Sequence, residues 1–194
     1  MSVTSASGDS GVISSVERIE QQQEMYNLTV DEAHTYFVGE GQWLVHNACS
    51  SALDRAMGGE VGDDKAAHHL IPGQLEKGDK KHPLVDRAIN HPTDPWKIDG
   101  ANNGMHLPST PELSAELNLP LHNTNHNPYT ESVKRRLDQL EIEEDTFIRE
   151  NGRPWTQDEL KQKLDDVAEE YRQRLRELGG GNRVPKDGLP EGWP

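Results

Sequence analysis

Ala67-His68-His69-Leu70-Ile71-Pro72 is the stretch of sequence that decides the fold and the chemistry of this chain. It is short, apolar on both flanks and ended by a proline, which predicts a β-strand carrying two adjacent histidines. Successive strand residues point to opposite faces, so the two imidazoles diverge unless the strand end is twisted or bulged. Such a distortion lets one imidazole bind a metal ion while its neighbour takes a proton from water.

A second pair of histidines, His122 and His126, follows four residues apart. Together with the doublet, the pair supplies three imidazole metal ligands and one imidazole left over. A divalent cation beside a spare general base can hydrolyse a phosphodiester. Pro128 places the start of a helix near Asn127, so His126 is expected just before its first turn.

Composition limits the classes of function. The chain has 194 residues, 32% of them hydrophobic, and a formal net charge of −14, which argues against a broad basic surface for nucleic acid. Any contact with phosphate must therefore be local. No apolar run approaches the roughly 18 residues of a membrane helix, and the first residues lack the pattern of a secretory signal. The single cysteine, Cys49, cannot form an internal disulfide.

Apolar periodicity predicts an α+β fold. Three short runs at 26–30, 35–38 and 43–46 indicate a β-meander, and 51–57 a short helix. A second strand is expected at 105–107 after an Asn-Gly turn, and residues 73–100 are expected to be loop. Two helices are predicted beyond, one from residue 127 and one opened by the capping box Thr156-x-x-Glu159.

The N-terminal segment ends in His46-Asn47. Residues 12–48 resemble the C-terminal end of a Hint domain, the fold of inteins and hedgehog autoprocessing modules. In such a module the Asn47 amide attacks its own carbonyl, which His46 activates, and the chain breaks before Ala48. The N-terminal half of that fold is missing from this sequence, so the segment is predicted to be an inactive remnant. The alternative is an unrelated β-meander with a chance His-Asn end.

Three motifs in order carry a second resemblance. They are Ala67-His68-His69-Leu70-Ile71-Pro72, Asn103-Gly104-x-x-Leu107-Pro108 and His122-x-x-x-His126-x-x-Tyr129-x-x-x-Val133. Residues 50–140 resemble the AHH family of toxin nucleases in the HNH (ββα-metal) superfamily. The resemblance implies a small ββα-metal core with additional helices, preceded here by the short β-meander.

The same resemblance implies roles for individual residues. His68, His122 and His126 would hold one divalent metal ion (Mg, Mn, Zn or Ni), and His69 would be the general base. Asn103, with Asn102 as the fallback, would orient the His69 ring.

Other polar side chains leave alternatives open. Lys134, Arg135 and Arg136 either bind substrate phosphates or form a solvated helix face. His106 is the first alternative metal ligand, whereas His34, His82 and His91 are expected to be ordinary surface or core residues. Tyr129 either covers the site or packs beside it.

The sequence thus predicts a Hint remnant at 1–48, a nuclease domain at 49–181 and a flexible tail at 182–194. The function predicted is a metal-dependent HNH-type endonuclease, with DNA favoured over RNA. The endonuclease would be the toxic C-terminal payload of a bacterial polymorphic toxin. It would be delivered into the target-cell cytoplasm and inhibited by an immunity protein. The rivals are a structural zinc module with a closed coordination sphere and a non-catalytic interaction protein.

Overall fold

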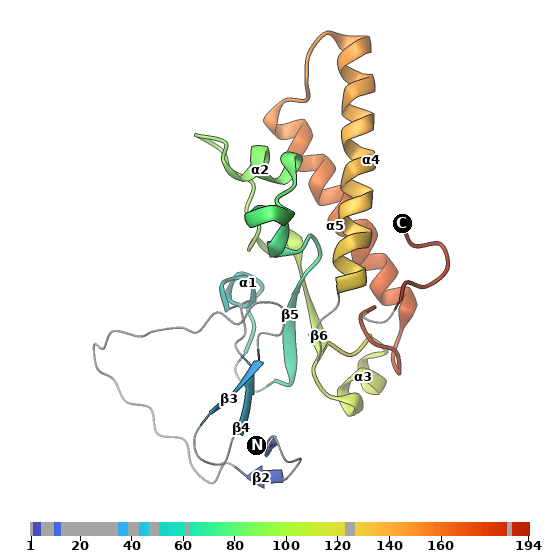
Figure 1. Ribbon diagram of the computed structural model, residues 1–194. Helices are drawn as coiled ribbons and strands as arrows, with labels where there is room; N and C mark the ends of the chain where they lie inside the picture. The colour runs from blue at the N-terminus through green and yellow to red at the C-terminus, as the bar shows by residue number, and fades with distance from the viewer. Residues whose placement is uncertain are drawn as a thin grey trace, which may run out of the picture. The chain divides into compact units, whose positions relative to one another are not determined.

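The computed structural model of the chain describes residues 2–4, 10–12, 35–38, 43–46, 51–60, 63–122, 127–185 and 188–194 (Figure 1). The chain divides into two compact units, Met1–Cys49 and Ser50–Pro194. None of the helices in these ranges is both long enough and apolar enough to cross a membrane.

The first unit contains two antiparallel strand pairs. Strand β1 (Ser2–Thr4) pairs with β2 (Ser10–Val12), and β3 (Thr35–Val38) pairs with β4 (Trp43–His46). The predicted strands at 35–38 and 43–46 are therefore confirmed, residue for residue. The predicted strand at 26–30 and Asn47 lie outside the described residues.

The second unit is built on a two-stranded antiparallel sheet, called the hairpin below, whose strands are far apart in the sequence. Strand β5 (Lys65–His69) pairs antiparallel with β6 (Gly104–Pro108), with His68 opposite Met105 and His69 opposite Gly104. The register is continuous and contains no bulge. His68 therefore lies on one face of the hairpin, and His69 lies on the other, which it shares with His106.

A short helix, α1 (Ser51–Ala56), covers the face that carries His69. Gly104 permits this close approach, because a Cβ there would lie 2.7 Å from Leu53 Cδ1 and closer still to the Met57 sulfur. Gly104 has a φ of −121°, so the Asn103-Gly104 pair does not need glycine for a positive φ. Its glycine makes room for a helix.

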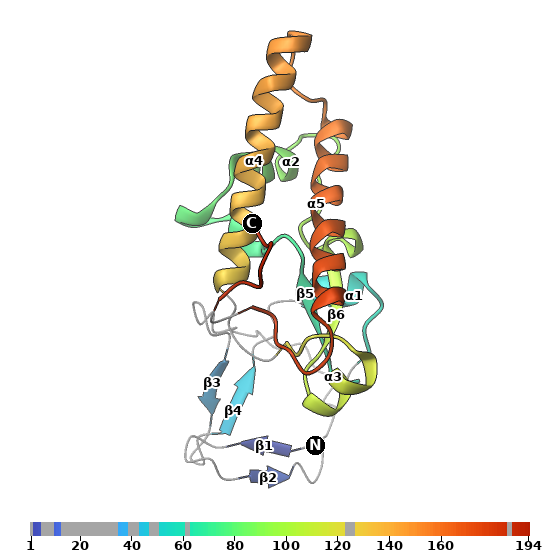
Figure 2. The same cartoon turned by 90° about the vertical axis from the view of Figure 1, so that its right-hand side faces the viewer.

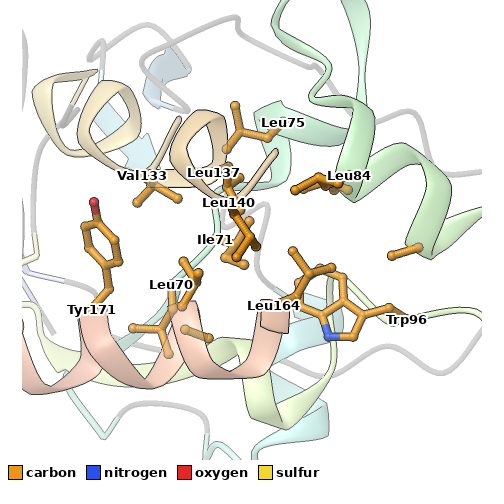
Figure 3. Packing of buried hydrophobic residues seen from close by; sticks show 14 of the residues in the cluster. Leu70, Ile71, Leu75, Leu84, Trp96, Val133, Leu137, Leu140, Leu164 and Tyr171 are labelled. Atoms are coloured by element: carbon orange, nitrogen blue, oxygen red, sulfur yellow. The ribbon is translucent and has the colours of Figure 1, made fainter. Parts of the chain in front are cut away.

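The opposite face of the hairpin meets two long helices, α4 (Asn127–Asn151) and α5 (Gln157–Leu178), which lie side by side (Figures 1 and 2). The predicted capping box at the start of α5 is confirmed, since both the Thr156 and the Glu159 side chains bond the backbone. Leu70 and Ile71, directly after β5, enter the core between these helices (Figure 3). Their neighbours there include Leu75, Leu84, Trp96, Val133, Leu137, Leu140, Leu164 and Tyr171.

The region 73–118 holds more helix than its prolines suggest. It forms the 3-10 turns η1 (Gly73–Glu76), η2 (Gly78–Lys80) and η3 (Ala101–Asn103), and the helices α2 (Pro83–Ile89) and α3 (Pro111–Leu117). The expectation of loop at 73–100 was therefore wrong in part. Pro83 and Pro111 occupy the first helical turn, where proline has no hydrogen bond to lose. His82 and Thr110 cap these helices with their side chains.

The C-terminal segment packs onto this unit. Val184 is buried, and Leu121 and Arg183 form an isolated parallel bridge. Trp193 rests edge-on against Tyr129 and Tyr171, with ring centroids 6.1 and 5.7 Å away. Val184 and Trp193 thus contact the core, while the flexibility predicted for 182–194 from its Pro/Gly content stays a prediction. A two-stranded sheet with helices on both faces confirms the predicted α+β class.

Candidate active site

The candidate site is centred on the end of strand β5. The His68 side chain is 2% exposed and lies on the core face of the hairpin. Its ring touches the His122 ring edge-to-face, with centroids 4.9 Å apart, and the Tyr129 ring at 4.8 Å. The structure therefore brings together two of the histidines predicted as metal ligands.

His122 reaches this position through its backbone. Its N–H donates to Pro108 O, at the end of β6, over 2.8 Å. The preceding residue, Leu121, is bonded on both sides to the C-terminal segment, at Asn182 O and Val184 N. His122 is thus held beside the hairpin without belonging to a helix. His126, the third predicted ligand, lies outside the described residues.

Tyr129 closes the back of the site. Its ring is fully buried and its hydroxyl donates to Leu70 O over 2.8 Å, one residue beyond His69. Burial raises the pKa of Tyr129 well above 10, so the hydroxyl keeps its proton and stays a donor. Tyr129 therefore both packs against His68 and fixes the end of the strand.

His69 lies on the other face of the hairpin and has a different partner. Its Nε2 lies 2.8 Å from Oδ1 of Asp99, a residue from the loop before β6. The His69 side chain is 18% exposed and that of Asp99 45%, so solvent reaches the pair. Sequence reasoning missed Asp99, since nothing in its local pattern separates it from the other aspartates.

Asn103, predicted to orient His69, is fully buried and bonds the backbone instead of the imidazole. Its Oδ1 accepts from Ile71 N at 2.7 Å, and its Nδ2 donates to Ile71 O and Ile98 O at 2.9 and 2.8 Å. Its own carbonyl accepts from Leu70 N. Asn103 thus fixes the two residues that follow His69. The fallback, Asn102, bonds Asp165.

Helix α5 clamps the loop that carries Asp99 and Asn103. Asp165 accepts hydrogen bonds from Trp96 Nε1 at 2.9 Å and from Asn102 Nδ2 at 3.2 Å. Arg172 donates to Asn102 O at 2.6 Å. Because one helix holds both ends of the loop, the polar groups beside β5 sit on a rigid support.

The donor set fits a divalent cation. His68 and His122 offer imidazole nitrogens from rings in contact, and neutral imidazole suits Zn and Ni well. Of the three residues predicted to bind this cation, His68 and His122 are in contact, and His126 lies outside the described residues.

The basic side chains predicted to bind phosphate have protein partners. Lys134 donates to both carboxylate oxygens of Asp138, and Arg136 bonds Glu143 and Glu170. Arg135 is exposed and donates to Pro194 O at 2.7 Å. Any role for these cations in substrate binding requires competition with those contacts.

A further group, His82 with Asp138 and Glu141, has ligand atoms within 4.8 Å of one another. Leu84 N donates to His82 Nδ1, which leaves the ring proton of the neutral imidazole on Nε2, the atom facing the two acids. A metal ligand must present a bare nitrogen, and Lys134 already holds Asp138. These three side chains therefore fit a polar contact between the start of α2 and α4, at 3.4 and 3.9 Å, better than a cation site.

His106, the alternative ligand, points away from His68. It shares the face of His69, and its Nε2 lies 2.9 Å from Asp54 Oδ1 of helix α1. The hairpin face covered by α1 thus carries two similar His–Asp pairs.

Comparison with known proteins gives one match. The AHH family model, described as a nuclease family of the HNH/ENDO VII superfamily with conserved AHH, matches residues 52–171, more than half of the chain. No curated protein and no solved structure matches. The matched range contains the hairpin, His122, Tyr129 and most of α5.

Proposed function

The chain belongs to the AHH nuclease family of the HNH/ENDO VII superfamily, and on this premise we propose that it is a single-metal endonuclease that prefers DNA. The observation that carries the proposal is the end of strand β5. There His68 meets the His122 ring on one face, while His69 pairs with a carboxylate on the other. In the proposed complex the phosphodiester lies at this end of the strand, next to the cation and to His69.

Each residue has a distinct part in the proposed reaction. His68, His122 and His126 would hold the divalent ion, which would stabilise negative charge on the phosphate and the leaving oxygen. His69 accepts a proton from the attacking water. Asn103 and Tyr129 fix the backbone after His69 through their bonds to Leu70 and Ile71. Arg135 and its neighbours on α4 contact phosphates flanking the cleaved bond.

Incubation of the protein with supercoiled plasmid and with RNA, with and without EDTA, tests the proposal. We expect nicking of plasmid that EDTA abolishes and that added Mg, Mn, Zn or Ni restores. Metal binding without cleavage of either substrate would favour the structural zinc module. No metal affinity and no cleavage would favour the interaction protein.

His69→Ala is the matched variant for this assay. Loss of a general base should lower the rate about 10²–10⁴-fold, whereas calorimetric metal affinity should stay near that of the wild type. Turnover at the wild-type rate in this variant would remove the proposed role of His69.

We also propose a biological context, which rests on the sequence of the first unit. The resemblance of residues 12–48 to the end of a Hint domain makes residues 49–181 the payload of a polymorphic toxin. Such a payload acts in the cytoplasm of a target cell, and an immunity protein protects the producer.

The remnant is expected not to cleave itself, because residues 12–48 resemble only the C-terminal end of a Hint domain. Intact-mass spectrometry after days at neutral pH should find a single full-length species. A product beginning at Ala48, absent from the Asn47→Ala variant, would show that the segment is still active.

A further inference from the structure

We propose that Asp99 is the positioning residue of the general base, accepting a hydrogen bond from His69 Nε2 and leaving Nδ1 to take the proton from water. This inference rests on the proposed nuclease function.

The contact itself sets the tautomer. An ionised carboxylate only accepts hydrogen bonds, so at 2.8 Å from Asp99 Oδ1 the Nε2 atom of His69 carries a proton. In the neutral ring Nδ1 is then bare. Within the described residues the His69 ring has no other hydrogen bond, so Nδ1 is available to a water molecule.

The position of Asp99 is built into the loop. On one side, Ile98 O accepts from the buried Asn103 amide, and Trp96 Nε1 is fixed to Asp165 of α5. On the other side, Gly100 N donates to Lys97 O. The backbone that carries Asp99 is therefore fixed on both sides before substrate arrives, and the carboxylate itself is held by its contact with His69.

Asp99 also borders open space. It lines a cleft of about 330 Å³ whose other walls are Glu76, Ile89, Trp96, Lys97 and Ile98. A surface ion pair between distant segments usually serves only to hold them, and contributes little. Of this pair, Asp99 lines the cleft, and His69, which belongs to the AHH motif, is itself partly open to solvent.

The proton path balances as follows. A water proton moves to His69 Nδ1 while the water oxygen forms a bond to phosphorus and the bond to the leaving sugar oxygen breaks. That oxygen takes a proton from solvent, and the imidazolium returns its proton to solvent. Asp99 takes up no proton in this scheme, and its carboxylate orients the ring and stabilises the transient positive charge.

The chain offers a matched control. Asp54 binds His106 Nε2 over 2.9 Å on the same face of the same hairpin, and the two carboxylates have similar exposure, 38% and 45%. A role that is merely structural would make Asp99→Ala and Asp54→Ala behave alike. A positioning role makes only the first affect turnover.

The experiment measures kcat and KM on a short duplex of whichever nucleic acid the wild type cleaves. Asp99→Ala should lower kcat about 10–100-fold, part of the 10²–10⁴-fold that a general base supplies, with KM changed less than about twofold. Asp99→Glu should recover part of kcat. In a His69→Ala background, Asp99→Ala should have no further effect. Asp54→Ala should keep kcat, and the Tm of both alanine variants should fall by no more than about 4 °C.

Nitrogen-15 NMR of the His69 ring gives a readout that needs no substrate. The wild type should show the proton on Nε2, and Asp99→Ala should shift the ring toward a mixture of tautomers. Wild-type kcat in Asp99→Ala, or a tautomer that does not respond, would overturn the proposal. If the wild type cleaves nothing, the proposed nuclease function is wrong. The NMR measurement still decides whether Asp99 determines the tautomer of the His69 ring.

Discussion

His68 and His69 are neighbours in sequence that the strand sends to opposite faces. The regular register of β5 and β6 places one imidazole in the core beside His122 and the other at an exposed rim beside Asp99. Because the two environments differ in burial, one ring is suited to hold a cation and the other to exchange protons with water. In the proposed reaction the doublet would thus separate two chemical tasks at a single point of the chain.

Removal of a metal ligand should separate these tasks experimentally. His122→Ala and His126→Ala should each lower both metal affinity and nuclease rate, because each deletes an imidazole donor. Isothermal titration with Zn or Ni checks the first effect and plasmid nicking the second. Unchanged metal affinity in His126→Ala would move that ligand role elsewhere, with His106 the first alternative.

The site was only partly predictable from sequence. His68 and His122 were predicted to share a site from their motif spacing, and the structure brings their rings into contact. Asp99 was not, since an aspartate beside a glycine occurs in many loops, and only folding brings it 30 residues back to His69. Asn103 was found by motif, but its contact with backbone rather than with the imidazole depends on three-dimensional packing.

Among the elements, the helices were predicted best where their own caps define them. The start of α5 follows from Thr156 and Glu159, whereas α2 was missed because Pro83 suggested a break, and no element was predicted where α3 lies. A proline after a capping side chain starts a helix, and only the surrounding core shows which role it has. The early strands β1 and β2 carry no strong apolar alternation and were not expected.

Glu144 joins three elements, and its loss should destabilise the fold. Its 5% exposed carboxylate accepts from Arg87 of α2 at 2.7 Å and from Trp155 N, ahead of α5, at 2.9 Å. Glu144→Ala leaves a buried N–H unpaired, so urea titration should show a loss of about 1–3 kcal/mol in the free energy of unfolding. The neighbouring Glu143→Ala breaks only surface contacts and should stay within about 1 kcal/mol. Equal losses in the two variants would contradict this interpretation.

His82 should make the packing of α2 on α4 sensitive to acid. Burial lowers the pKa of His82, although Glu141 and Asp138 act in the opposite direction and Lys134 adds to the lowering. The unfolded chain takes up the proton at a pH of about 6.5, whereas the folded chain resists it, so the free energy of unfolding falls as pH drops below that value. The free energy of unfolding stops falling once the pH is below the pKa of His82 in the folded state.

Urea unfolding between pH 5 and 8, compared between the wild type and His82→Asn, isolates this effect. Asparagine keeps an N-cap for α2 but does not titrate. The stability of the wild type relative to the variant should therefore be greatest above pH 7 and smaller at pH 5. A difference that is independent of pH would show that His82 has the same pKa in both states.

At the scale of the whole molecule, the C-terminal segment supports the site from behind. Trp193 packs on Tyr129, whose hydroxyl holds Leu70, and residues 182–184 hold Leu121 beside His122. Trp193→Ala should therefore lower the free energy of unfolding by about 1–3 kcal/mol and reduce cleavage as well. Thermal unfolding and plasmid nicking check the two effects. Glu191→Ala, at an exposed position of the same segment, should change neither the free energy of unfolding nor the cleavage rate. A Trp193→Ala variant with wild-type stability and cleavage would show that the segment is dispensable.

The order of the site's parts along the chain has a consequence for synthesis. His69 leaves the ribosome early, Asp99 and His122 follow, and the part of α5 that clamps the loop comes roughly a hundred residues after the doublet, several seconds later at about 5–20 residues per second. Until then the loop lacks its support, so the nascent chain is expected to be catalytically silent. A chain ending before Trp155 should accordingly bind little metal and cleave nothing. The proposed site would therefore be completed only after α5 has been synthesised and has packed on the loop.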